Sequence, residues 1–301
     1  MTTEISGVLP VFQTPFHTDE SIDFATLDRE IDWLFENRAN GIVMAMVSET
    51  FRLATDERRK LAAHICKTVG GRGVTIISVG SESTHTSAAL ARDAEAVGAD
   101  ALMAIPPVAT AATEYELAEY FRQILKATSI PLIIQDASGY VGKPMTISLQ
   151  AQMLDDFPDR VLFKPEAEPV IGRLRELLRE TNGQARVFEG SGGMHLLESF
   201  KQGVSGTMPG ADLTPVVSAL WSALEAGDTG RADRISQPLI KLVELQTNLD
   251  AYLAVEKYLL CRQGVFRNTV IRGPVAFELE DDLRTKVDVL FDELCMVLND
   301  D

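Results

Sequence analysis

The sequence predicts an α/β protein, a (β/α)8 barrel followed by a C-terminal helical appendage. Short runs that are apolar almost throughout, as in strands buried on both faces, alternate with amphipathic helical patterns. Eight such strand-then-helix units fill about 225 residues, which is typical of a closed barrel. The turn after the first strand, Gln13 to Phe16, lacks the glycine-rich phosphate-binding pattern that a doubly wound sheet would carry there.

The individual elements follow from these patterns in chain order. Strands are expected at residues 8–12, 42–46, 74–79, 101–105, 132–135, 161–164, 187–189 and 206–208. Amphipathic helices are expected at residues 24–38, 56–69, 84–97, 114–127 and 168–180, among others. Thr55 and Thr113 stand where helix N-caps are expected, and Glu116 gives the second of them capping-box spacing.

The strand pattern stops after Gly230. Residues 231–245, 249–264 and 281–298 then have helical periodicity, and a turn at Arg272-Gly273-Pro274 separates the last two. The sequence therefore predicts a barrel over residues 1–228 that carries the active site. A three-helix extension over residues 229–301 is expected to pack on it.

Composition limits the classes of partner. The chain of 301 residues has 28 Lys and Arg against 44 Asp and Glu, a net charge of −16, which disfavours nucleic acid and anionic lipid. Three widely spaced cysteines with no CxxC pair indicate reduced thiols and a cytoplasmic protein. The N-terminus has no signal-peptide pattern, and no apolar segment approaches the roughly 20 residues that span a bilayer.

The chemistry is concentrated at the end of the sixth strand. Lys164 lies at this buried strand end, and an amine in such a place is expected to be a nucleophile that forms Schiff bases with carbonyls. Glu166, two residues on, points the same way from an extended strand, and Pro165 between them fits only near a strand terminus. Because barrel active sites lie at the C-terminal ends of strands, we expect a nucleophile beside an acid–base group. The alternative is an exposed ion pair of little energetic value.

Other possible catalytic or ligand-binding motifs have less support in the sequence. The four histidines are scattered without metal-ligand spacing, and no serine has a neighbouring histidine in the sequence. The run Gly190 to Gly193 could cradle a phosphate at a helix start, but it lacks Walker or dinucleotide spacing. It favours a tight turn whose backbone contacts the substrate. We therefore expect no metal and no nucleotide cofactor.

With these motifs in view, the chain resembles the dihydrodipicolinate synthase / N-acetylneuraminate lyase family of Schiff-base barrels over nearly its whole length. Within the family it is most similar to dehydratases of 2-keto-3-deoxy pentonates. The resemblance implies a homotetramer without a cofactor beyond the covalent Schiff base. It is carried by Pro10 to Phe16, Ser48 to Phe51, Thr55 to Arg58, Met103 to Pro107, Ile134 to Ala137, Phe163 to Glu166, Gly203 to Met208, Lys257 and Arg272 to Pro274.

Three departures separate the chain from the synthases. The family's Gly-Thr-Thr-Gly-Glu after the second strand is replaced by the shorter Met46-Val47-Ser48-Glu49. Gln135 stands where the synthases and lyases carry a catalytic tyrosine, and Tyr140 stands where the synthase has a carboxylate-binding arginine. Glutamine cannot perform general acid–base work, so the chain is not expected to be a true dihydrodipicolinate synthase.

The resemblance also implies roles for single residues. Lys164 and Glu166 are the catalytic pair. The hydroxyl of Ser48 and the neighbouring backbone amides are expected to bind the carboxylate of the 2-keto acid. Gln135 is expected to form a hydrogen bond with a substrate hydroxyl or with the carboxylate. Glu49 either contacts substrate or supports the fold. The substrate-binding set is completed by Gly190 and Met208.

These residues favour a lyase that dehydrates a 2-keto-3-deoxy sugar acid through an iminium on Lys164. A 2-keto acid is thus the small-molecule partner. The first alternative is a class I aldolase that releases pyruvate and an aldehyde. The second is an inactive barrel that binds keto acids, which the missing tyrosine permits and the retained Lys164 and Glu166 disfavour.

Overall fold

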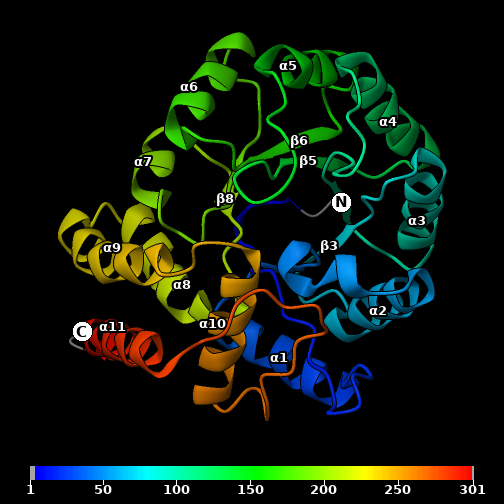
Figure 1. Cartoon of the computed structure of the whole chain (residues 1–301). Helices are drawn as coiled ribbons and strands as arrows, with labels where there is room; N and C mark the ends of the chain where they lie inside the picture. Colours follow the sequence, from blue (N-terminus) through cyan, green and yellow to red (C-terminus); the bar gives the residue numbers. More distant parts are fainter. Residues whose placement is uncertain (1–3, 300–301) are drawn as a thin grey trace.

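The computed structural model describes residues 4–299 and contains eight parallel strands surrounded by helices (Figure 1). The strands are β1 (Gly7–Val8), β2 (Gly41–Val43), β3 (Val74–Ser78), β4 (Ala101–Ala104), β5 (Leu132–Asp136), β6 (Val161–Pro165), β7 (Phe188–Glu189) and β8 (Gly206–Thr207). The barrel helices are α1 (Phe24–Glu36), α2 (Thr55–Val69), α3 (Thr84–Ala96), α4 (Glu114–Ala127), α5 (Ile147–Asp156), α6 (Val170–Glu180), α7 (Leu196–Lys201) and α8 (Thr214–Glu225).

The strands close into a ring, which confirms the predicted barrel. Regular ladders join β2 through β6 in sequence order and join β1, β8 and β7. Parallel bridges from Val11 to Val43 and from Phe163 to Val187 connect the two groups. The first strand is shorter than predicted because Pro10 has no N–H to donate. The chain nevertheless stays paired beyond it, since Val11 N donates to the carbonyl of Pro209 at 2.8 Å.

Apolar side chains fill both faces of the barrel wall. One cluster lies inside the ring and includes Leu9, Val43, Ile76, Met103 and Phe188, all of them buried. A second, larger cluster lies between the ring and the surrounding helices. This double burial is why the strands are apolar at successive positions instead of alternating with polar residues.

The helix starts follow the predicted capping chemistry with one exception. Thr113 caps α4 as a capping box, because its hydroxyl accepts from the Glu116 amide at 3.3 Å and its own amide donates to the Glu116 carboxylate at 2.9 Å. The predicted cap at Thr55 is wrong. Residue 55 is already the first residue of α2, and Ala54 takes the N-cap position with its amide donating to Glu57 at 2.9 Å.

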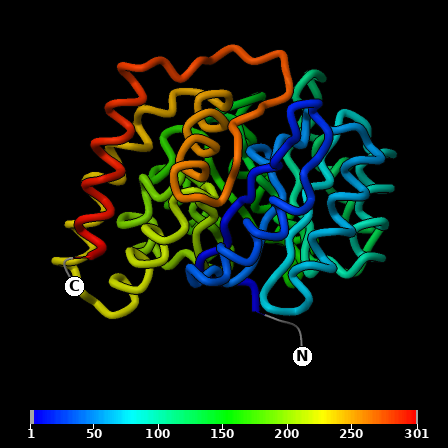
Figure 2. Tube along the Cα trace, turned by 90° about the horizontal axis from the view of Figure 1, so that it is seen from below, coloured from blue at the N-terminus to red at the C-terminus, as the bar shows by residue number. Residues whose placement is uncertain are grey.

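The extension contains the three predicted helices, α9 (Thr229–Glu244), α10 (Leu249–Arg262) and α11 (Asp281–Asn299). Residues 263–280 between the last two contain no helix or strand, and they run across one end of the barrel in Figure 2. Arg272 in this segment, hereafter the tail strap, pairs with Glu57 of α2 through two 2.7 Å contacts. The tail strap thus ties the extension to the barrel. No helix within residues 4–299 is both long and apolar enough to cross a membrane.

Candidate functional site

Lys164 and Glu166 form a buried pair at the C-terminal end of β6. Lys164 Nζ lies 2.9 Å from Glu166 Oε1, and each residue is 4% exposed. Their shared direction follows from the two-residue period of extended chain. Burial distinguishes this pair from a rim ion pair, because two desolvated charges interact far more strongly than exposed ones.

Gln135 is hydrogen-bonded to the second carboxylate oxygen of Glu166. It lies on β5 directly opposite Lys164 in the parallel register, and its Nε2 donates to Glu166 Oε2 at 2.6 Å. Burial raises the pKa of the Glu166 carboxyl, and the charge of Lys164 and the Gln135 amide oppose that rise. Both oxygens of Glu166 therefore accept from donors, an arrangement that suits a proton acceptor.

Gly190 lets the backbone after β7 approach this pair. A Cβ placed on Gly190 would lie 2.6 Å from Lys164 Cε and 2.8 Å from Glu166 Oε1. Such distances are far inside van der Waals contact. Only a glycine fits here without displacing both side chains. This steric requirement explains the glycine without any phosphate binding.

A small pocket with a cavity volume of about 40 Å³ opens above the pair. The predicted residues Gln135, Lys164, Glu166, Gly190 and Met208 all line it, and Met208 follows β8. The structure therefore brings together five of the seven predicted site residues. The other lining residues are Val11, Ala45, Met46, Val47, Tyr140, Gly192, Gly210, Leu249, Tyr252 and Glu256.

Ser48 and Glu49 are not among the residues that line the pocket. The Ser48 hydroxyl donates to the carbonyl of Phe12 at 2.7 Å and accepts from the amide of Ala45 at 3.2 Å. The side chain thus holds η1 (Met46–Ser48) against the chain after β1. Substrate contact by Ser48 remains a prediction, and Ala45, Met46 and Val47 face the pocket on this side.

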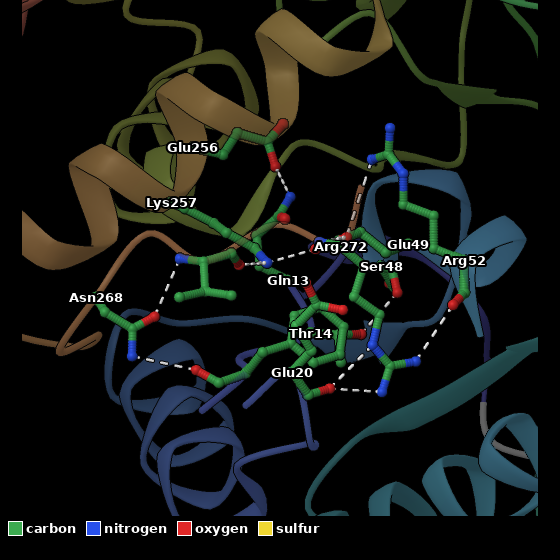
Figure 3. Close-up of polar contacts among 12 residues, drawn as sticks. Gln13, Thr14, Glu20, Ser48, Glu49, Arg52, Glu256, Lys257, Asn268 and Arg272 are labelled. Atoms are coloured by element: carbon green, nitrogen blue, oxygen red, sulfur yellow. Dashed lines mark hydrogen bonds and ion pairs between the residues drawn. The ribbon is translucent and has the colours of Figure 1, made fainter. Parts of the chain in front are cut away.

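Glu49 joins the barrel to the extension. Figure 3 shows its carboxylate next to Lys257 of α10, with which it forms an ion pair in which both side chains have no solvent exposure. The backbone amide of Arg272 in the tail strap donates to its other oxygen at 3.3 Å. These contacts match the fold-supporting alternative, and substrate contact by Glu49 also remains a prediction.

Three pocket residues come from α10, although the sequence assigned the site to residues 1–228. Leu249, Tyr252 and Glu256 are spaced three and four apart, so they share one helix face. That spacing was visible in the sequence, but nothing in it indicated that this face covers the strand ends. Tyr140, which follows β5, lies edge-on to Tyr252 with ring centroids 5.5 Å apart.

Among residues 4–299, no group of three or more His, Cys, Asp or Glu side chains is arranged to hold a metal ion. The four histidines stay apart from the pocket lining. The expectation that the site works without a metal or nucleotide remains a prediction.

A (β/α)8 barrel with a buried lysine, a carboxylate and a pocket at the C-terminal ends of its strands has the form of a barrel enzyme. The chain belongs to the dihydrodipicolinate synthetase family, which it matches over residues 4–294. It is a lyase of that family, as the resemblance in its motifs indicated.

Two curated relatives span almost the full chain. L-2-keto-3-deoxyarabonate dehydratase of Azospirillum brasilense is 28% identical over 287 residues, covering 93% of this chain and 92% of the relative. The probable 2-dehydro-3-deoxy-D-pentonate aldolase YjhH of Escherichia coli K12 is 25% identical over 292 residues, covering 95% and 96%. The 4-hydroxy-tetrahydrodipicolinate synthase of Methylacidiphilum fumariolicum SolV has the same fold, with a TM-score of 0.90 at 23% identity and coverage of 99% and 98%.

Proposed function

We propose that this lyase forms a Schiff base between Lys164 and a 2-keto acid and removes water from a 2-keto-3-deoxy sugar acid. The observation that carries the proposal is the 2.9 Å contact between Lys164 Nζ and Glu166 Oε1. After condensation, the former carbonyl carbon C2 is bonded to Nζ, and C3 is one bond further. Glu166 therefore lies within reach of the C3 protons, which the iminium acidifies.

The same geometry favours dehydration over aldol cleavage. Water loss begins with removal of a C3 proton, next to the iminium. Aldol cleavage needs a base at the C4 hydroxyl, two bonds further along the substrate. Gln135 cannot supply that base, and its amide is engaged with Glu166. The dehydratase from Azospirillum brasilense, at 28% identity, supports this choice.

The pocket lining also favours a substrate with one carboxylate. Lys164 is the one Lys or Arg among the lining residues, and the resemblance in sequence motifs puts Tyr140 where the synthases have an arginine. A second carboxylate would have no lining cation to neutralise it, and burying an unpaired charge is costly. Hydroxyl groups on the distal carbons would instead meet Tyr140, Tyr252 and Glu256.

The aldolase reading remains the second candidate because YjhH is 25% identical to this chain. The two reactions differ in where Glu166 acts, which is at C3 in dehydration and at the C4 hydroxyl in aldol cleavage. The products differ, since only the aldolase releases pyruvate.

The test is intact mass after sodium borohydride treatment with pyruvate or 2-keto-3-deoxyarabonate. Reduction should leave a stable adduct on Lys164 that is absent from Lys164→Ala and retained in Lys201→Ala, which removes an exposed lysine. Analysis of the unreduced reaction should find a dicarbonyl acid. Pyruvate in its place would select the aldolase, and the absence of any adduct would overturn the proposal.

A further inference from the structure

Glu256 is a pocket carboxyl that the reaction above leaves without a role. It lies on α10, is 3% exposed and lines the pocket with Lys164 and Glu166. Gln13, which follows β1, donates its side-chain amide to Glu256, as Figure 3 shows. A titratable group of the C-terminal extension thus reaches the substrate pocket.

Two further carboxyls are buried around Glu256. Asp212 lies on η3 (Ala211–Leu213), and a Cβ placed on Gly210 would be 2.5 Å from Glu256 Oε1 and 2.9 Å from Asp212 Oδ1. Glu30 on α1 accepts from the backbone amide of Gln13 at 2.9 Å. Three carboxyls on three different elements therefore surround Gln13 and Gly210.

The charges around Glu256 favour its protonated form. Burial is the main cause that raises the pKa of Glu256, and the carboxyls of Asp212 and Glu30 raise it further. The charge of Lys164 and the amide of Gln13 act in the opposite direction. Tyr252, on the same helix, is uncharged, since burial raises the pKa of its phenol above its ordinary value.

Lys257 is hydrogen-bonded outside this group of carboxyls, although its charge opposes the rise that burial causes in the pKa of Glu30. Its ammonium is bonded to Glu49 and, at 2.7 Å, to the carbonyl of Val270. Glu166 and Glu256 consequently have different surroundings: Glu166 accepts from a cation and an amide, whereas Glu256 has one amide donor and two carboxyl neighbours. Two carboxyls set apart in this way are suited to opposite acid and base roles.

The proposed dehydration requires such a second group. A 2-keto-3-deoxy pentonate becomes a dicarbonyl acid only if C3 and C5 each lose a proton and the C4 oxygen leaves as water. Glu166 is the base that removes the proton from C3. We infer that Glu256 is a catalytic acid and base for the distal carbons, protonating the departing C4 oxygen and then removing a proton from C5. This inference rests on the proposed function.

The proton count closes without another reactant. Glu166 takes the C3 proton, which gives an enamine with a C2=C3 bond. The C4–O bond breaks as C3=C4 forms, and Glu256 gives its proton to the oxygen, which leaves as water. The Glu256 carboxylate then takes a C5 proton, which regenerates its acid form and leaves an enol at C4 and C5. Glu166 returns its proton to C3, which restores the iminium at C2. The enol becomes an aldehyde as C4 gains a proton and the C5 hydroxyl loses one, and water hydrolyses the iminium.

The test distinguishes the roles of the two carboxyls by comparing the variants Glu256→Gln and Glu166→Gln. With pyruvate in D2O, Glu256→Gln should retain the borohydride adduct and wild-type exchange of the C3 hydrogens, because both depend on Lys164 and Glu166. With the 2-keto-3-deoxy pentonate it should still exchange at C3, while water loss falls by about 100-fold or more. Glu166→Gln should lose the exchange itself.

A second variant tests how the proton on Glu256 is held. Asp212→Asn removes a carboxyl neighbour, so the pKa of Glu256 falls and the alkaline limb of the kcat–pH profile should move to lower pH. Wild-type turnover in Glu256→Gln, or an equal loss of C3 exchange and turnover, would overturn the assignment, as would an unmoved alkaline limb in Asp212→Asn. A wild-type protein that forms no adduct would instead overturn the proposed function.

Discussion

Gly190→Ala tests whether the close approach of the backbone sets the geometry of the proposed catalytic pair, Lys164 and Glu166. The added methyl carbon would lie 2.6 Å from Lys164 Cε, 2.8 Å from Glu166 Oε1 and 2.9 Å from Glu166 Cδ. Carbon atoms in contact sit about 3.5–4.0 Å apart, so the lysine side chain or the backbone must move by about 1 Å. One substituent therefore affects the side chains of both Lys164 and Glu166.

The expected loss follows from that displacement. A misplacement of about 1 Å at a reacting group costs about 100-fold in rate. This corresponds to about 2.7 kcal/mol of transition-state stabilisation. Overpacking of this kind also destabilises a fold by about 1–3 kcal/mol. We therefore expect Gly190→Ala to remain folded and to lose about two orders of magnitude in kcat/KM.

The assay is turnover of the 2-keto-3-deoxy pentonate, together with the rate of borohydride trapping with pyruvate. Gly230→Ala is the matched control, because a Cβ there would contact nothing closer than 3.7 Å. It lies in α9, where alanine is favoured over glycine by up to about 1 kcal/mol, so it should be as active as wild type and no less stable. Wild-type turnover in Gly190→Ala would refute the steric reasoning.

Further predictions concern stability. Lys257→Met should lower the free energy of unfolding by up to about 3–5 kcal/mol, because the buried carboxylate of Glu49 then keeps only a 3.9 Å contact with Arg52 and the backbone amide of Arg272. Arg59→Met breaks an exposed ion pair and should cost about 0–1 kcal/mol in the same denaturant titration. Equal losses in the two variants would contradict the role given to burial. Hydrogen bonding from Arg272 lowers the pKa of Glu57 from 4.5 to about 2. A lowered folded-state pKa stabilises the fold above pH 4.5, and this contribution is lost as the pH falls toward 2. The stability difference between wild type and Glu57→Gln should therefore shrink over that interval, and a difference that is constant with pH would contradict the assignment.

Much of the site could be predicted because its residues obey local rules. The buried strands are recognisable from runs of apolar residues, and a (β/α)8 barrel brings the ends of all its strands to one face. Lys164 and Glu166 share a direction because they are two residues apart on one strand. Gln135 stands at the end of the preceding strand, so contact with this pair follows from the fold order.

Predictions beyond the strand ends depended on the path of loops and helices. Ser48 follows the second strand as expected, but η1 turns its hydroxyl toward the carbonyl of Phe12. The position of the Thr55 cap was wrong by one residue, because the Glu57 carboxylate accepts from the amide of Ala54 and the helix starts earlier. Both differences arise from side-chain hydrogen bonds, and local sequence patterns do not show which of the possible hydrogen bonds will form.

The sequence by itself determined the barrel, the lysine–carboxylate pair and the absence of a catalytic tyrosine at position 135. These features depend on periodicity, on strand order and on residue identity, all of which are local. Only the tertiary structure decided that Glu49 pairs with Lys257, that Gly190 presses against Lys164, and that Glu256 enters the pocket. Each of these contacts joins elements far apart in the chain. The contacts of Lys257 and Glu256 are set by how the helices of the extension pack on the barrel, and that of Gly190 by how the chain after β7 lies beside β6, which no local pattern encodes.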